Sequence, residues 1–310
     1  MLSICGRVTI EKDGQPIDAA AAKDLPAGAW QVTVINLRGI KQVTDAGLMH
    51  VRAMKSLRTL DLNDSPVSSV GLQHFRELTS LTELFLERTI VDNAGLEHLE
   101  KLPKLTAIYL VDTRGVDDAG MESLSRVKTL ETLGLCGTKI GNASLERIRT
   151  LANLKSLDLS CTKVTDSGMP HLKNLPNLTS LSLWGTQVGN DGLQHLETVT
   201  KLKHLHLNGS RVTGAGLVHL KKMQNLTHLN VNGVNVGNEG MIHIGALSSL
   251  TFIDLNAAKV GDQGVAPLKN LKKLETLWLQ GNDYDDTALP HLYGMKSLRF
   301  ICLTKTKVTA

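Results

Sequence analysis

The chain has 310 residues, of which 42% are hydrophobic and only 3% aromatic, so its core must be built mainly from leucine, valine and isoleucine. A formal net charge of +4, from 34 basic and 30 acidic residues, is too mild to favour a polyanionic partner. The sequence has no run of about 18 apolar residues and no basic-then-apolar N-terminal pattern, so we expect a soluble protein with no membrane partner.

The first 31 residues lie outside the regular pattern that fills the rest of the chain. Val8, Thr9 and Ile10 form a short strand-like stretch, Asp13-Gly14 is a turn signal, and Ile17 follows it. We therefore predict a hairpin or strand that caps what comes next. The predicted domain division is a capping segment at 1–31 and a repeat array at 32–310.

From residue 32 onwards a Leu-x-x-Leu-x-Leu pattern recurs at a spacing of 24 or 25 residues. A period in this range is typical of a solenoid, in which stacked units bury one continuous core. We predict an α/β solenoid of about twelve units, the last incomplete, with a curved parallel sheet on the concave face and short helices on the convex face. The units open at Val32, Leu57, Leu81, Leu105, Leu130, Leu154, Leu178, Leu202, Leu226, Leu250, Leu274 and Leu298.

Each unit is predicted to contain a strand, a polar turn and a helix of about two turns. In the unit that opens at Leu154, the alternation places Leu157 and Leu159 inward, in a strand of about three to five residues that pairs in parallel with its copies. Small hydroxyl side chains at the exit of the strand are expected to bond the backbone of adjacent turns. They are Ser65, Thr89, Thr113, Thr138, Thr162, Thr186, Ser210 and Thr306.

A second column of polar residues precedes each predicted helix. Every member is Asp, Asn, Ser or Gly, the residue types preferred at a helix N-cap. We therefore predict that these side chains cap the helices that they precede. The column comprises Asp45, Ser69, Asn93, Asp118, Asn142, Asp166, Asn190, Gly214, Asn238, Asp262 and Asp286.

These residues resemble a leucine-rich repeat array. The form Leu-x-x-Leu-x-Leu-x-x-Thr-x-Val-x-Asp-x-Gly-Leu-x-x-Leu is similar to short repeats of planctomycete-type bacterial proteins, and to the cysteine-containing subtype with Thr in place of Cys. The resemblance covers Val32 to Thr309. It implies a solenoid fold and a role in binding other proteins.

Eleven histidines fall into two groups. Eight occupy one helix position of the repeat and are expected to be half-buried structural residues: His50, His74, His98, His171, His195, His219, His243 and His291. The other three, His204, His206 and His228, lie at outward strand positions about one strand spacing apart. They predict a polar recognition patch, with a zinc or nickel site as the alternative.

Six of the ten aromatic residues fall at outward strand positions, on the predicted concave face. Phe75 and Tyr284 instead replace core aliphatic residues. Exposed aromatic side chains are enriched at binding surfaces, so we predict that this face binds a partner. The candidate partner-binding residues are Phe85, Tyr109, Trp184, His204, His206, His228, Phe252, Trp278 and Phe300.

The sequence therefore favours a non-enzymatic scaffold that binds a protein partner, with no cofactor and no metal. A glycan-binding module is the alternative, since Trp184 and Trp278 lie beside Asn and Asp side chains. Basic residues near the outward positions (Arg38, Arg88, Lys305) are too few for nucleic acid. The C-terminal end stops inside a unit, so we expect it to self-associate or to pair with residues of a longer protein. The cysteines Cys5, Cys136, Cys161 and Cys302 follow no disulfide spacing, which favours a cytoplasmic location.

Overall fold

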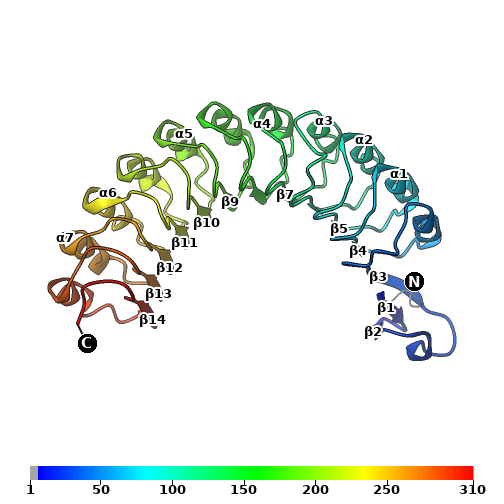
Figure 1. Cartoon of the computed structure of the whole chain (residues 1–310), viewed down its shortest axis with the longest axis horizontal. Helices are drawn as coiled ribbons and strands as arrows, with labels where there is room; N and C mark the ends of the chain where they lie inside the picture. The colour runs from blue at the N-terminus through cyan, green and yellow to red at the C-terminus, as the bar shows by residue number, and fades with distance from the viewer. Residues whose placement is uncertain (1–5, 310) are drawn as a thin grey trace. The chain divides into compact units, whose positions relative to one another are not determined.

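The computed structural model describes residues 6–309, and the chain divides into two compact units, Met1–Leu154 and Lys155–Ala310. Cys5 lies outside the described residues. Within each unit the strands pair side by side along one side, in chain order from β3 onwards, and the helices lie along the other side (Figure 1). The predicted α/β repeat architecture is confirmed, with strands of three residues in the array from Thr59 onwards.

The first unit opens with an antiparallel hairpin. Strand β1 (Arg7–Lys12) pairs with β2 (Gln15–Ala19) through a turn at Asp13 and Gly14, both at positive φ, and on its other side it pairs antiparallel with β3 (Gln31–Asn36). The predicted N-terminal hairpin is therefore present and covers the outer edge of β3. Parallel strands follow: β4 (Thr59–Asp61), β5 (Glu83–Phe85), β6 (Ala107–Tyr109) and β7 (Thr132–Gly134).

The second unit is parallel throughout its described strands, and paired residues are 24 positions apart, as in His204 opposite His228. Its strands are β8 (Ser156–Asp158), β9 (Ser180–Ser182), β10 (His204–His206), β11 (His228–Asn230), β12 (Phe252–Asp254), β13 (Thr276–Trp278) and β14 (Phe300–Cys302).

Short α- and 3-10 helices line the other side of each unit. Those of the first unit are η2 (Ala22–Asp24), η3 (Ala46–Ala53), α1 (Ser69–Leu72), η4 (Gln73–Glu77), α2 (Asn93–Leu96), η5 (Glu97–Leu99), α3 (Gly120–Leu124) and α4 (Asn142–Ile148). Those of the second are η6 (Asp166–Asn174), α5 (Asn190–Gln194), η7 (His195–Thr198), η8 (Gly214–Lys222), α6 (Gly237–Ile244), α7 (Asp262–Val265), η9 (Ala266–Asn270) and η10 (Asp286–Leu292). No helix of the described chain is long and apolar enough to cross a membrane.

The core of each unit is made from the repeated aliphatic positions. Leu57, Leu60 and Leu62 are all fully buried, so the three leucines of the Leu-x-x-Leu-x-Leu pattern point inward together. Phe75 and Tyr284 are buried among them, as predicted, and the Tyr284 hydroxyl donates to the Leu279 carbonyl at 3.0 Å. A buried hydroxyl therefore keeps its hydrogen bond.

The polar column at the helix starts does not cap its own helices, so that prediction is wrong. Asp166 is the first residue of η6, and its Oδ1 accepts a hydrogen bond from the backbone N–H of Gly189, one repeat later, at 2.6 Å. The same contact joins successive repeats along the array, and we call it the inter-repeat ladder. Its other acceptors include Asp45, Ser69, Asn93, Asp118, Asn190, Asn238, Asp262 and Asp286.

Glycine at the third helix position leaves room for this ladder. A Cβ on Gly192 would collide with the Asp166 carboxylate and would lie 2.8 Å from Val188 Cγ1. Ser144 occupies the equivalent position in α4, where its hydroxyl donates to Asp118. At Gly192 a side chain from the preceding repeat therefore occupies the space that a Cβ would need, whereas Ser144 is accommodated by its bond to Asp118.

The hydroxyl column also differs from the prediction. Thr162 donates to the Leu159 carbonyl of its own turn at 2.6 Å, whereas Thr113 donates to the Leu86 carbonyl of the preceding repeat at 2.7 Å. The hydroxyls mainly close their own turns. The other members that bond within their own turn are Ser65, Thr89, Thr138, Thr186 and Thr306.

Candidate functional site

The strands of the second unit lie along the side away from its helices (Figure 1). The outward residues of these strands, with the residue two positions after each strand, form three rows. The middle residue of each strand from β8 to β13 is buried and its two neighbours are half-buried. We call these rows the open face. The first row is Ser156, Ser180, His204, His228, Phe252, Thr276 and Phe300; the second is Asp158, Ser182, His206, Asn230, Asp254, Trp278 and Cys302; the third is Ser160, Trp184, Asn208, Asn232, Asn256, Gln280 and Thr304.

The first row contains a continuous stack of planar rings. The His204 and His228 rings are 4.4 Å apart with an interplanar angle of 23°, and Phe252 follows at 5.6 Å and 17°. Strand spacing sets these separations, since neighbouring parallel strands lie about 4.8 Å apart. The predicted clustering of His204 and His228 is therefore present, as a stack.

The stacked arrangement of His204 and His228 does not support the alternative of a zinc or nickel site. The lone pairs of imidazole lie in the ring plane, so two rings stacked face to face do not direct them at a shared ion. The Nδ1 atom of His228 is also 2.9 Å from the Thr227 hydroxyl. Within residues 6–309 no cluster of three or more His, Cys, Asp or Glu side chains is arranged to hold a metal.

Two of the three imidazoles have a pKa below the ordinary value for histidine. Burial lowers the pKa of His206, with a further contribution from His204, while Asp158 opposes the shift. Burial, His204 and His206 lower the pKa of His228. Near neutral pH these two rings are therefore uncharged, and this part of the open face is polar rather than cationic.

The tryptophans occupy two different settings. Trp278 lies on β13 and its ring is 4.9 Å from that of Phe300, which is 44% exposed. Trp184 is not on a strand, contrary to the prediction, but two residues beyond β9. It is 49% exposed, and its Cδ1 and Nε1 edge would lie 3.6 and 3.7 Å from a Cβ built on Gly209.

The charges of the open face are acidic. Its three rows contain Asp158 and Asp254 and no lysine or arginine. Asp158 Oδ1 accepts from the Ser160 N–H at 2.9 Å and from its hydroxyl, and the Ser160 and Ser182 hydroxyls are 2.7 Å apart. Both oxygens of Asp254 accept hydrogen bonds, from the Asn256 N–H at 3.0 Å and from Asn232 Nδ2 at 3.4 Å.

Phe85 and Tyr109 form a separate pair in the first unit. Their rings stack at 4.6 Å with an interplanar angle of 4°, and burial raises the pKa of Tyr109. Nearby, Arg88 binds both carboxylate oxygens of Asp64, at 2.5 and 2.8 Å, which lowers the pKa of that carboxyl. Both residues end their strands at paired positions, in keeping with the outward strand positions predicted for them.

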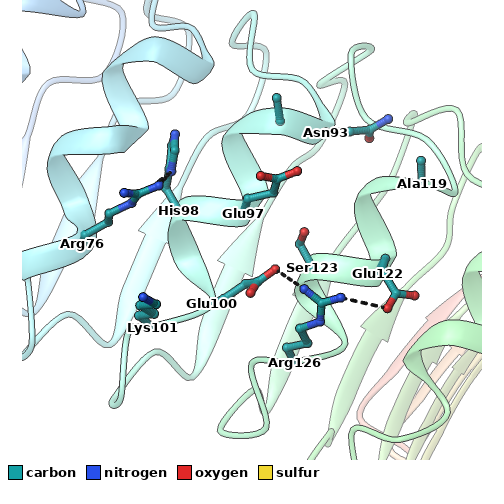
Figure 2. A pocket seen from close by; sticks show the side chains of 11 residues that line it. Arg76, Asn93, Glu97, His98, Glu100, Lys101, Ala119, Glu122, Ser123 and Arg126 are labelled. Atoms are coloured by element: carbon teal, nitrogen blue, oxygen red, sulfur yellow. Dashed lines mark hydrogen bonds and ion pairs between the residues drawn. The ribbon is translucent and has the colours of Figure 1, made fainter.

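A cleft on the helix side of the first unit was not predicted (Figure 2). It has a volume of about 600 Å³ and is lined by α2, η5 and α3 with mixed charges. Arg126 binds Glu100 at 2.9 Å and Glu122 at 3.2 Å, and Arg76 contacts His98 Nδ1 at 2.9 Å. Burial and the adjacent Arg76 lower the pKa of His98. Because these charges already pair with one another, the cleft has the character of a solvated ion-pair network.

The histidine column behaves largely as expected. Seven of its eight members are half-buried on the helix side, and His50 is exposed. His219 contacts Glu197 at 2.8 Å, and Lys222 binds the same carboxylate at 2.9 Å, which together lower the pKa of Glu197 to about 2. The column is therefore a structural feature of the helix side.

Comparison with solved structures shows the same architecture elsewhere. An internalin (inlF) of Listeria monocytogenes is 20% identical with a TM-score of 0.69, covering 90% of this chain and 82% of that one. A leucine-rich repeat protein of Leptospira interrogans is 19% identical with a TM-score of 0.62, covering 81% and 62%. The ectodomain of the Arabidopsis thaliana receptor kinase GASSHO1/SCHENGEN3, in complex with CASPARIAN STRIP INTEGRITY FACTOR 2, is 17% identical with a TM-score of 0.56, covering 92% and 40%.

The chain thus spans less than two thirds of the last two proteins, and at these identities the likeness concerns the fold. No curated protein matches the sequence. The leucine-rich repeat region family matches residues 27–266, which is well over half of the chain. Together with the repeated strand, turn and helix described above, this match establishes that the chain belongs to the leucine-rich repeat family.

Proposed function

We propose that this protein is a non-enzymatic scaffold that binds a protein partner through the open face of its second unit. The observation that carries the proposal is the ring-rich surface formed by the His204–His228–Phe252 stack, the Trp278–Phe300 pair and the exposed Trp184. Aromatic side chains are enriched at the centres of protein interfaces because they bury a large area at a low entropic cost.

The repeat itself does not require these rings, which supports a role in recognition. Strands β8 and β9 place Ser156 and Ser180 in the same row that holds His204 and Phe252 in later strands, and both kinds of strand pair in the same register. A solenoid strand is therefore formed equally well with serine at this position.

The plant receptor ectodomain with the same fold was solved with a bound factor, which supports protein recognition by this architecture. The stacked Phe85 and Tyr109 of the first unit provide a further contact region in the proposal. A cytoplasmic location remains part of it, in keeping with the free thiols of Cys161 and Cys302. Self-association through β14 is a further part of the proposal.

Affinity capture from the native cell tests the proposal, with the wild-type chain compared with Trp184→Ala and Trp278→Ala. Each truncation is expected to weaken capture by about 2 kcal/mol or more while leaving the melting temperature nearly unchanged. Ile242→Ala is the matched control, because Ile242 is a 63% exposed apolar residue on helix α6. Capture that survives both tryptophan truncations, or that is abolished by glycosidase treatment of the captured material, would contradict the proposal.

A further inference from the structure

The acidic character of the open face contrasts with the chain as a whole. The formal net charge of the chain is +4, yet the three rows of the open face contain two aspartates and no basic side chain. His206 and His228, whose pKa values are lowered, add no positive charge near neutral pH. A partner that buries this face must supply the missing cation, because a buried unpaired carboxylate is costly.

Asp158 is the carboxylate that is ready to receive such a cation. Its Oδ1 is held by the N–H and hydroxyl of Ser160, whereas its Oδ2 has no hydrogen-bond or ion-pair partner among residues 6–309. Asp254, in the same row, has both oxygens engaged by Asn232 and Asn256. Asp158 therefore differs from Asp254 in having one carboxylate oxygen free, and the bonds to its other oxygen fix the orientation of the carboxylate.

Small side chains next to Asp158 leave space for a partner group. Ser182 is paired with Asp158 on one side and with His206 on the other, so these two side chains flank it across about 10 Å, which is two strand spacings. In the first row Ser180 likewise lies beside His204, whose other face is covered by His228. We call the space above Ser180 and Ser182 the serine slot.

The walls of the serine slot are suited to a flat cationic group. One wall is the Asp158 carboxylate, the opposite wall is formed by the imidazoles of His204 and His206, and the exposed Trp184 follows Ser182 by two residues. A guanidinium is planar, stacks on aromatic faces, and donates two parallel hydrogen bonds to a carboxylate. An ammonium is a compact, strongly hydrated charge that gains less from ring faces.

We propose that the serine slot receives an arginine side chain of the protein partner, which pairs with Asp158 Oδ2 and stacks against the neighbouring rings. The inference rests on the proposed function, since it names the chemistry by which the open face recognises its partner. It goes beyond that function by assigning the slot to one residue type and Asp158 to the role of its counter-charge.

The experiment uses N-acetyl-L-arginine methylamide as the probe and its citrulline counterpart as the uncharged control of the same shape. The chain has three tryptophans, so the Trp184 indole N–H can be assigned with one substitution and followed by NMR. Titration to about 20 mM suits the millimolar affinity expected of one side chain. The wild-type chain is compared with Asp158→Asn and with Asp254→Asn as the matched control.

We expect the arginine probe to shift the Trp184 signal in the wild-type and Asp254→Asn chains, and to bind about fivefold to tenfold more weakly to Asp158→Asn. The citrulline probe should bind the wild-type chain about as weakly as the arginine probe binds Asp158→Asn. Equal binding of both probes, equal binding to both variants, or no shift at the highest concentration would overturn the inference.

These outcomes are distinct from failure of the proposed function. If the arginine probe fails but the tryptophan truncations abolish partner capture, the scaffold function stands and the arginine assignment is wrong. If the probe binds as expected but capture is indifferent to Trp184 and Trp278, the serine slot exists and the proposed interface is wrong.

Discussion

The carboxylate of Asp166 accepts a hydrogen bond from the backbone N–H of Gly189, one repeat further along the chain, at 2.6 Å. Gly189 is buried, so loss of the acceptor would leave its N–H unsatisfied. We expect Asp166→Ala to lower the free energy of unfolding by about 1–3 kcal/mol, measured by urea denaturation. Asp166→Asn keeps an acceptor and should cost less; equal losses for the two variants would contradict the ladder.

Replacing Gly192, which lies beside the ladder contact, with alanine is expected to change stability in the opposite direction to most Gly→Ala substitutions in helices. Gly→Ala at a compatible helical position stabilises by about 0.4–1 kcal/mol. At Gly192 the new Cβ would collide with Asp166 and Val188, so we expect a loss of about 1–3 kcal/mol instead. In the Asp166→Ala background the loss should shrink, and a double-mutant cycle with zero coupling would argue against this contact.

The repeated core predicts a large effect for a single strand leucine. Leu157 is 1% exposed at the centre of β8, and its removal leaves a cavity that the parallel neighbours cannot close. Leu157→Ala should lower the free energy of unfolding by about 2–5 kcal/mol in the same assay. Ser156→Ala, on the open face of the same strand, serves as the control and should change stability little.

The two histidines with lowered pKa values make stability depend on pH. Unfolded imidazoles titrate near 6.5, whereas His206 and His228 in the folded chain titrate lower, so the unfolded state binds more protons at mildly acidic pH. The free energy of unfolding should therefore fall as pH is lowered below about 6.5 and be unaffected by these groups above it. His206→Gln and His228→Gln should each flatten this dependence; identical profiles would refute it.

Among residues 6–309 the outer edge of β14 has no partner strand. Phe300 is 44% exposed and Ile301 is half-buried, whereas Ile253 and Leu277, the equivalents of Ile301, are fully buried. A strand edge with apolar flanks is a template for pairing, either with a second copy or with further residues of a longer chain. We expect a concentration-dependent mass in light scattering that Ile301→Lys abolishes and Ile242→Lys on α6 does not. A strict monomer at high concentration would exclude pairing with a second copy.

The fold was predictable because its information is periodic. Leucines such as Leu157 recur at one spacing, and that spacing gives both the inward face and the strand partner 24 residues away. The same spacing places Phe85 opposite Tyr109 on neighbouring strands, where their rings stack.

The features that the sequence did not predict depend on where a side chain points, and the period of the repeat does not give that direction. Asp166 is a residue type that is common at helix N-caps, but in the folded chain its carboxylate reaches Gly189 instead of its own helix. Trp184 falls beyond its strand because β9 ends at Ser182. The cleft beside Arg76 and Arg126 joins side chains of varying identity from several repeats, and no periodic pattern marks them.

Gly214 interrupts the inter-repeat ladder, because it stands in the ladder column without a side-chain oxygen. Here the backbones meet instead: a Cβ on Gly240 would lie 2.7 Å from the Gly214 Cα. At this point the Gly214 N–H donates to the Asn235 carbonyl at 2.9 Å, so a backbone hydrogen bond joins the two repeats where a side chain does so at Asp166 or Asn190. Because the hydrogen bond at this step is made by the backbone, no truncation of a side chain in the ladder column can remove it.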